Sequence, residues 1–150
     1  MISFTKKNEK YACFSNFYKC KVIFDGLVFS SSEAAWQSQK TSHKIIRKIF
    51  QNKEPAEAKK LGRQVPLRAN WEDIRYQLMV DVCYAKFSQN SDLKKILLST
   101  NQEELVENTT GWHDNIWGNC DCPKCRSIKG QNLLGKALME VREKLRSEAE

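Results

Sequence analysis

A carboxylate, an indole and an amine fall on one side of a short predicted helix near the N-terminus. The stretch SSEAAWQSQK, residues 31–40, contains no proline or glycine, which favours a helix after its serines. At about 100° per residue, one face collects the functional groups, and these are Glu33, Trp36, Gln37 and Lys40. Seven residues, or roughly 10 Å along the axis, separate Glu33 from Lys40, so the two do not directly neutralise each other on that helix. The face is either a solvated helix side or the floor of a site.

A second polar and aromatic cluster lies in GWHDNIWGNCDCPKCRSIKGQN, residues 111–132. Asp114 stands between Trp112 and Trp117 in the sequence, with His113 beside it. An aromatic plate that stacks on a ring, together with a carboxylate that fixes its orientation, is typical of a ligand wall. A loop anchored by its tryptophans explains the same pattern, so both interpretations stay open.

Three cysteines within six residues indicate a metal site in the same segment. Cys120, Cys122 and Cys125 include a CPKC stretch with the CxxC spacing of a zinc knuckle. Tetrahedral zinc needs a fourth ligand, for which His113 is the nearest candidate, and the other candidates are Cys13, Cys20 and Cys83. No second CxxC pair follows, so redox-active or free thiols stay open as alternatives. We expect a structural zinc ion here, with no catalytic role.

Length and composition indicate a single globular domain, residues 1–150. The formal net charge is +7, from 25 Lys and Arg against 18 Asp and Glu, which favours anionic partners such as phosphates, nucleotides or nucleic acid. The lysines are dispersed, and no basic stripe with interleaved aromatics marks a DNA groove. No apolar run reaches the roughly 20 residues of a membrane span, and the N-terminus lacks the apolar core of a signal peptide. We therefore expect a cytoplasmic protein without a membrane partner.

The elements that must position these groups are mostly helices. KVIFDGLVF, residues 21–29, predicts a hairpin around an Asp25-Gly26 turn of type I′. Ser30 with Glu33 resembles a capping box for the helix that follows, and Asn70 is expected to cap the longest helix. Further helices are expected in HKIIRKIFQN, in EPAEAKKLGRQ, from about Trp71 to Phe87, after Ser91 and in NLLGKALMEVREKLRSE, with a strand in EELVENT. The predicted class is α+β, mainly α-helical with a few short strands that are not spaced as βαβ units.

Seven motifs, in order along nearly the entire chain, resemble the NADAR superfamily and its YbiA-like members. They are FSNFY (14–18), SEAAWQSQK (32–40), AEAKKLGRQVPLRANW (56–71), AKFSQN (85–90), ELVE (104–107), DNIWG (114–118) and GQNLLGKALMEVR (130–142). One departure is plain: many YbiA-like proteins have a short glycine-rich loop after the WG, whereas this chain has the cysteine segment. Because that loop is expected to shape substrate choice, the resemblance leaves the substrate open.

The resemblance implies an N-glycosidase that cleaves the C1–N bond between a ribose and a base or amine. Characterised family substrates include phosphorylated ribosylamino-pyrimidine intermediates of riboflavin synthesis and ADP-ribose attached to guanine, so metabolite repair and reversal of a nucleic-acid modification both stay open. It implies that Glu33, Lys40 and Asp114 form the polar centre. The residues that it implies as the pocket lining are Asn16, Trp36, Arg63, Trp117 and Asn132. It implies no organic cofactor, and water is the second substrate.

Each polar residue has a task in such a reaction. Positive charge builds on the sugar carbon, so Glu33 and Asp114 are expected to divide charge stabilisation and proton donation to the leaving nitrogen. Arg63 is the candidate for a phosphate contact. Lys40 is the candidate nucleophile, since an amine captures an opened ribose C1 as a Schiff base. That chemistry needs a neutral amine, which burial against Trp36 would favour; a charged Lys40 that holds a phosphate is the alternative.

Two other classes of protein remain as rivals. The first is a module that binds ADP-ribose or a nucleotide without cleaving it, although a lysine and two acids favour an enzyme. The second is a zinc-dependent nucleic-acid-binding protein, which would bind DNA with a steep dependence on salt. The sequence leaves the oligomeric state open.

Overall fold

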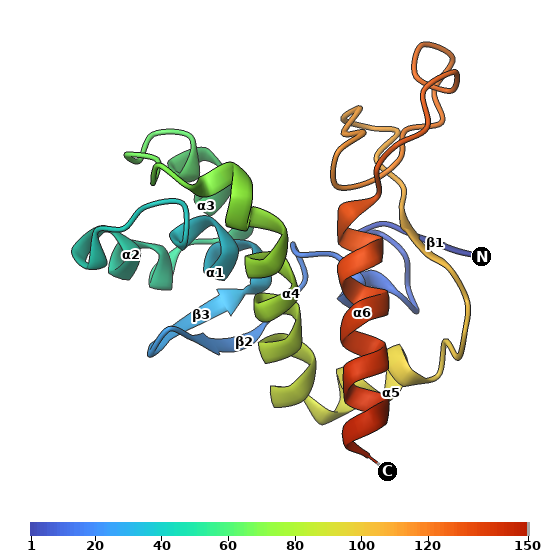
Figure 1. Cartoon of the computed structure of the whole chain (residues 1–150), viewed down its shortest axis with the longest axis horizontal. Helices are drawn as coiled ribbons and strands as arrows, with labels where there is room; N and C mark the ends of the chain where they lie inside the picture. The colour runs from blue at the N-terminus through green and yellow to red at the C-terminus, as the bar shows by residue number, and fades with distance from the viewer. Residues whose placement is uncertain (150) are drawn as a thin grey trace. The chain divides into compact units, whose positions relative to one another are not determined.

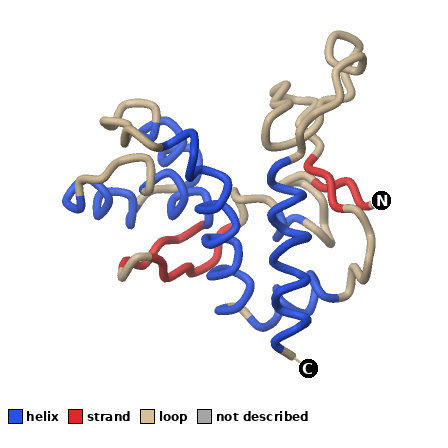
Figure 2. The backbone as a smooth tube through the Cα atoms, in the orientation of Figure 1, coloured by secondary structure: helices blue, strands red, loops and turns tan. Residues whose placement is uncertain are grey.

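The computed structural model describes residues 1–149 and is mainly helical, with four short strands among these residues (Figures 1 and 2). The predicted α+β class is therefore confirmed. Two compact units make up the chain. Unit 1 combines Met1–Ser15 with Lys95–Glu150, and unit 2 is the continuous segment Asn16–Lys94.

Unit 2 begins with the predicted hairpin. Strands β2 (Lys19–Phe24) and β3 (Leu27–Ser31) pair antiparallel, and Asp25 and Gly26 form the turn between them. Both turn residues have positive φ, 54° and 72°, which is the backbone that a type I′ turn requires. The prediction from the Asp-Gly pair is confirmed, because this turn matches the right-handed twist of the paired strands.

The helices of unit 2 follow the hairpin in the predicted order. They are α1 (Ser32–Ser38), α2 (Lys44–Ile49), the 3-10 turn η2 (Phe50–Asn52), α3 (Pro55–Gly62) and α4 (Trp71–Gln89). Helix α1 contacts α3, α4 and β3, so other elements of its own unit surround this short helix. Phe29, Phe50 and Phe87 are fully buried and form part of the apolar core of this unit.

Of the two predicted helix caps, the one at Ser30 is wrong and the one at Asn70 holds in position only. The N-cap of α1 is Ser31, whose hydroxyl accepts a hydrogen bond from the Ala34 amide at 3.1 Å, and the hydroxyl of Ser30 instead donates to the Lys53 carbonyl. Strand β3 continues to Ser31, two residues beyond the predicted hairpin, and the cap lies one residue later than expected. Asn70 occupies the N-cap position of α4 but makes no side-chain capping bond.

Unit 1 contains the remaining elements: β1 (Ile2–Phe4), the 3-10 turn η1 (Ala12–Phe14), the second half of α5 (Ser91–Leu98), β4 (Leu105–Glu107) and α6 (Leu133–Glu148). Strands β1 and β4 pair in parallel, although about 100 residues separate them. The sequence predicted the second strand and missed the first. The predicted apolar stripe of α6 is fully buried, as expected for Leu134, Leu138, Val141 and Leu145.

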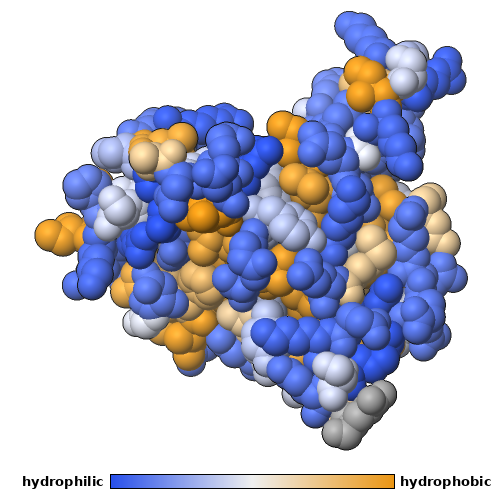
Figure 3. Space-filling model, viewed as in Figure 1, coloured by the Kyte–Doolittle hydropathy of each residue, from blue (hydrophilic) through white to orange (hydrophobic). Residues whose placement is uncertain are grey.

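The visible surface carries few apolar side chains. On the face drawn in Figure 3, hydrophilic residues cover most of the area, and the hydrophobic spots are small and scattered. The exposed large apolar residues are spread along the sequence, as Ile45 and Ile128 illustrate. Among the described residues, every helix is too short or too polar to cross a membrane.

We expect Ser31→Ala to lower the free energy of unfolding by about 1 kcal/mol, because the buried Ala34 amide loses its acceptor. Ser30→Ala is the matched control and should cost less than about 0.5 kcal/mol, since its hydroxyl bond is exposed. Denaturant titrations of both variants and the parent protein measure the difference. Equal losses in the two variants would argue against Ser31 as the cap.

Candidate functional site

Helix α1 is buried on all sides, although half of its side chains are polar. All seven of its residues, Ser32–Ser38, are classed as buried. Helices α3 and α4 and strand β3 pack around it within unit 2. The small residues Ala34 and Ala35, both with no exposed surface, permit this close packing. The interpretation as a solvated helix side is therefore excluded, and the polar groups of α1 must find their partners inside the protein.

Glu33 and Gln37 form a buried pair on this helix. The exposed fractions of the two side chains are 7% and 4%. The Gln37 Nε2 donates a hydrogen bond to Glu33 Oε1 at 2.9 Å, across one helical turn. Glu33 is thus a sequestered carboxylate that accepts a side-chain amide proton, an environment suited to charge stabilisation or proton transfer.

Lys40 lies just beyond α1 and not within it. The helix ends at Ser38, and the Lys40 amide bonds the Gln37 carbonyl at 3.2 Å while the Lys40 carbonyl accepts from Arg68. Its side chain is half-buried, with Nζ 5.5 Å from the centre of the Trp36 ring. The predicted proximity of the amine and the indole is confirmed.

The surroundings of Lys40 lower the pKa of its amine relative to an ordinary lysine. Burial lowers the pKa of Lys40 below its usual value, Glu33 opposes this effect, and the positive charges of Arg63 and Lys59 add to it. The Trp36 ring face attracts a charged Lys40 amine, whereas burial disfavours the charge, so these two effects on the amine are opposite. A lysine with a lowered pKa has the property that a Schiff-base nucleophile needs.

Trp36 is fixed by α4. Its indole Nε1 donates to the Arg75 carbonyl at 3.2 Å, and its ring lies 5.0 Å from that of Trp71 at an angle of 55°. Only 7% of the residue is exposed. It therefore acts as a rigid wall beside Lys40, and its contact with a substrate stays a prediction.

A buried polar cluster at the start of α1 includes two residues that the sequence did not single out. Ser32 Oγ bonds Asn16 Oδ1 at 2.8 Å, and Lys86 Nζ donates to Ser32 Oγ at 3.3 Å. The exposed fraction of Lys86 is 1%. The resemblance implied Asn16 as a pocket residue, and Asn16 lies in the FSNFY motif. Lys86 lies in the AKFSQN motif, but the sequence analysis gave it no role.

Arg63 follows α3 and is exposed. It is near enough to Lys40 to lower the pKa of that amine, so the two cations belong to one positive region of unit 2 together with Lys59. An exposed guanidinium beside a half-buried amine suits an anionic group of a ligand. Its phosphate contact stays a prediction.

Asp114 lies in unit 1 and organises a turn. Its Oδ1 accepts the amides of Ile116 at 2.8 Å and Trp117 at 2.9 Å, and its carbonyl accepts the Thr109 hydroxyl at 2.6 Å. A carboxylate with two backbone donors has a clear structural task. Its second task in chemistry stays a prediction.

Asn132 and Trp117 also belong to unit 1. The Asn132 amide bridges β4, where Oδ1 accepts the Glu107 amide and Nδ2 donates to the Leu105 carbonyl. Asn132 has a φ of 52°, in the left-handed region that asparagine tolerates better than most residues. The structure thus explains this residue through its bonds to β4, and its place in a pocket lining stays a prediction, as does that of half-buried Trp117.

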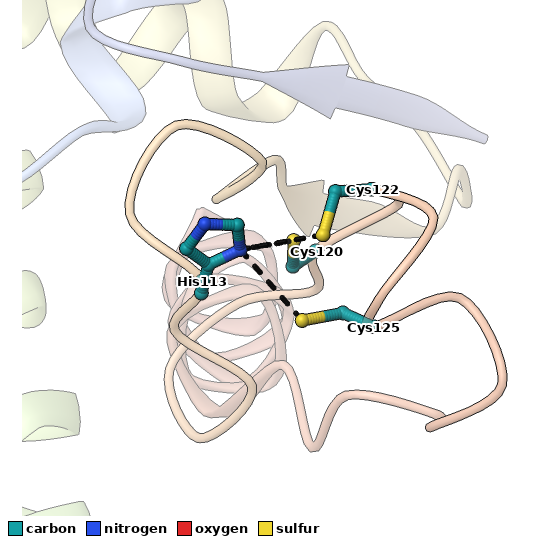
Figure 4. Close-up of side chains that lie close together, drawn as sticks. All are labelled: His113, Cys120, Cys122 and Cys125. Atoms are coloured by element: carbon teal, nitrogen blue, oxygen red, sulfur yellow. Dashed lines mark hydrogen bonds between the residues drawn. The ribbon is translucent and has the colours of Figure 1, made fainter.

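The predicted ligands of a metal ion converge in unit 1. His113, Cys120, Cys122 and Cys125 place one ligand atom each within 4.8 Å of all the others. Figure 4 shows the imidazole facing the thiols. The His113 Nδ1 lies 3.3 Å from the sulfur atoms of Cys120 and Cys122 and 3.7 Å from that of Cys125. Backbone bonds from residues 125 and 126 to the Cys122 carbonyl form the knuckle. This cluster can hold a metal ion.

The thiols of this cluster differ in acidity. Burial raises the pKa of Cys120 to about 11. Although burial also acts on Cys122, hydrogen bonds from Cys120 and Cys125 hold its pKa at about 7. His113 is the fourth member of the cluster that the structure assembles. The other cysteines weighed as ligands, Cys13, Cys20 and Cys83, are not part of it.

Comparisons with known proteins give matches that cover almost the whole chain. A model of the NADAR domain family matches residues 3–146. The N-glycosidase YbiA of Escherichia coli (strain K12) is 36% identical, over 97% of this chain and 88% of its own length. The N-glycosidase Npun_R5314 of Nostoc punctiforme is also 36% identical, over 97% of this chain and 93% of its own.

Two further comparisons extend this result. The riboflavin biosynthesis protein VVA0006 of Vibrio vulnificus is 33% identical over 99% of this chain, which spans 39% of that longer protein. The NMR structure of E. coli YbiA has a TM-score of 0.83 and 36% identity to this chain, covering 99% of this chain and 86% of its own.

We expect the Lys40 amine to take up a proton at lower pH than an ordinary lysine, because burial disfavours the charged form. Glu33→Gln should move that protonation to still lower pH, since the Glu33 charge raises the pKa of Lys40. Reductive ¹³C-methylation followed by NMR titration measures both, and Lys40→Arg identifies the signal. A Lys40 signal that titrates with the bulk of the lysines would contradict this environment.

Proposed function

The chain belongs to the NADAR family, and we propose that it hydrolyses the C1–N bond between a phosphorylated or ADP-linked ribose and a base or amine. It is a hydrolase that acts on N-glycosyl bonds, in keeping with its N-glycosidase relatives. The single NADAR domain that we propose covers residues 1–150, which the family match over residues 3–146 supports. A cytoplasmic location stays a prediction.

The observation that carries the mechanism is the placement of Glu33 and Lys40 around α1. One is a buried carboxylate and the other an amine whose pKa burial lowers. An N-glycosidase needs a negative charge near the sugar carbon and a nucleophile or base that is uncharged when it reacts. Unit 2 supplies both groups.

We propose that Lys40 attacks C1 of the ring-opened ribose. Opening breaks the bond from C1 to the ring oxygen, which takes a proton from the glycosidic nitrogen and leaves an imine at C1. The Lys40 Nζ then bonds to C1, and its two protons pass by way of Glu33 to the former glycosidic nitrogen. The bond from C1 to that nitrogen breaks, so the base departs as an amine and leaves an imine between C1 and Lys40. Water attacks the lysine imine, restores the amine and yields the free sugar, so one water is consumed for each base released.

The substrate class that we propose is a ribosyl group that carries phosphate. The formal net charge of +7 and the positive region of Arg63, Lys59 and Lys40 favour an anionic ligand. Both ribosylamino-pyrimidine phosphates and ADP-ribosylated guanine in nucleic acid have this feature. The longer Vibrio relative is named a riboflavin biosynthesis protein, which supports the first of the two as a test compound.

We expect release of free base when the protein is incubated with one of these two compounds. Lys40→Arg should lower the rate on the order of a thousandfold or more, because arginine keeps the charge and does not readily form an imine. Borohydride added during turnover should leave a sugar adduct on Lys40, which peptide mass spectrometry locates.

Lys44→Arg is the control for this experiment, since Lys44 is exposed on α2 and outside the proposed site. Tight binding of both compounds without base release would identify a binding module instead of an enzyme. A fast Lys40→Arg enzyme with no adduct would leave Lys40 as a phosphate anchor and assign the chemistry to carboxylates, Glu33 first and the predicted Asp114 second.

We also propose that the ion held by His113 and the three cysteines is zinc, with a structural role. Three thiols and one imidazole form a common donor set for structural zinc. Tetrahedral bonds of about 2.0–2.3 Å place neighbouring ligand atoms about 3.5–3.8 Å apart. The observed Nδ1 to Sγ separations of 3.3 to 3.7 Å lie close to this range. Four protein ligands close the site, which leaves no open position for substrate.

We expect about one equivalent of zinc in protein purified without added metal, and less than a tenth would contradict the zinc proposal. Cys122→Ser should lower the midpoint of thermal unfolding by several degrees, because metal binding is coupled to folding. Cys20→Ser is the control, since Cys20 is half-buried in β2, outside the cluster. Loss of activity in Cys122→Ser with unchanged thermal stability would contradict the structural role.

A further inference from the structure

The amide of Gln37 is held in one orientation inside unit 2. Its Nε2 donates to Glu33 Oε1 at 2.9 Å, while its Oε1 is buried and has no hydrogen-bond partner. A buried polar atom without a partner costs free energy, so some other gain must maintain this arrangement. That gain is the hydrogen bond that Nε2, on the other side of the amide group, donates to the Glu33 carboxylate.

Gly62, the last residue of α3, makes room for this amide. A side-chain carbon at residue 62 would overlap Gln37 Oε1 and stand 2.8 Å from Gln37 Cδ. The φ of Gly62 is not in the left-handed region, so the backbone conformation alone does not require glycine here. Alanine is also the better helix former. The close approach of Gln37 is therefore the reason for glycine at this position.

The two orientations of the amide are not equivalent. With Nε2 toward Glu33, the carboxylate receives a proton donor, and Oε1 lies beside Gly62 without a hydrogen-bond partner. The flipped orientation would direct an oxygen at Glu33 and leave the two N–H donors on the Gly62 side without an acceptor. A charged Glu33 thus selects the observed orientation, and the observed orientation favours a charged Glu33.

We propose that Gln37, seated on Gly62, is the positioning residue for Glu33, fixing its rotamer and its charged state. The inference rests on the proposed role of Glu33 in N-glycoside cleavage. Basic side chains also lie near α1: Lys40 and Arg68 at its C-terminal end, Lys59 and Arg63 from α3 and the residue after it, and Lys86 from α4. The Gln37 amide differs from these groups because it is a neutral donor that bonds the Glu33 carboxylate directly.

A double-mutant cycle tests this arrangement. Gln37→Ala and Gly62→Ala should each lower kcat about tenfold with little change in KM, since each removes a donor from the proposed charge-stabilising carboxylate. In the Gln37→Ala background, Gly62→Ala should change kcat less than about twofold. There the new methyl group meets the carbon at residue 37 at 3.5 Å, an ordinary contact.

Two control variants match these changes elsewhere in the chain. Gln77→Ala removes the same kind of bond, Gln77 Nε2 to Asp81 Oδ1 at 2.9 Å, on an exposed part of α4. Gly111→Ala adds a methyl group in open space at a residue whose φ is not in the left-handed region. Both should keep the kcat of the parent enzyme. A Gly62→Ala loss that is equal in both backgrounds, or an unchanged kcat in Gln37→Ala, would overturn the proposal.

A second measurement is independent of turnover. The Glu33 carboxyl signal in ¹³C NMR, identified by its absence in Glu33→Gln, should titrate at higher pH in Gln37→Ala and Gly62→Ala than in the parent protein. An unshifted titration in both variants would overturn the positioning role even if the parent enzyme is active. If the parent cleaves neither test compound while the signal shifts as expected, the proposed function fails and the positioning of Glu33 holds.

Discussion

Helix α1 places polar side chains in the buried interior of unit 2, and the packing of that unit must supply hydrogen-bond partners for them. Ser32, Glu33 and Gln37 are all more than nine-tenths buried. Each needs a partner inside the protein, because an unsatisfied buried polar group costs more than a single hydrogen bond returns. Asn16 and Lys86 supply partners at the beginning of the helix, and Gln37 supplies one for Glu33 at its middle.

The same condition accounts for the small residues around α1. Ala34 and Ala35 have small side chains and Gly62 has none, which allows α1 and its neighbours α3 and β3 to approach closely around the polar groups. Enclosure also lowers the pKa of Lys40, since the amine at the edge of this shell has lost part of its hydration. The close packing around α1 and the lowered pKa of Lys40 therefore have the same cause. The more closely these elements enclose the amine, the lower its pKa becomes.

In unit 1, residues 109–132 form a long segment without helix or strand, so other contacts must hold its backbone in place. Side-chain bonds to the backbone replace regular pairing there, with Asp114 and Asn115 accepting amides within the segment. The cluster of one histidine and three cysteines joins distant points of the same loop. A metal ion in such a place stabilises a loop that has few apolar contacts of its own. Local polar residues and not a hydrophobic core therefore shape this part of the chain.

Local patterns in the sequence determined much of this protein. The Asp25-Gly26 turn, the stripe of α6 and the order of the helices depend on neighbouring residues or a fixed helical period, so they were predicted correctly. The convergence of His113 with the three nearby cysteines was also expected from their spacing, and their binding of a metal ion stays a prediction. The family was likewise evident in the ordered motifs, and the comparisons confirm it. The cap at Ser31 was missed by one residue, since the end of β3 depends on its pairing with β2 and not on the local sequence.

Only the tertiary structure decided which polar groups meet. The parallel pairing of β1 with β4 joins segments about 100 residues apart, and no local signal marks it. From the sequence, the helical position of Lys86 predicts a core residue, and Gly62 predicts the end of a helix. Lys86 contacts Ser32 because α4 packs on α1, and Gly62 contacts Gln37 because α3 packs on α1. A periodicity states which face of a helix is buried, but the partner of each buried group depends on the other helix, because burial and hydrogen bonding are satisfied between elements and not along one.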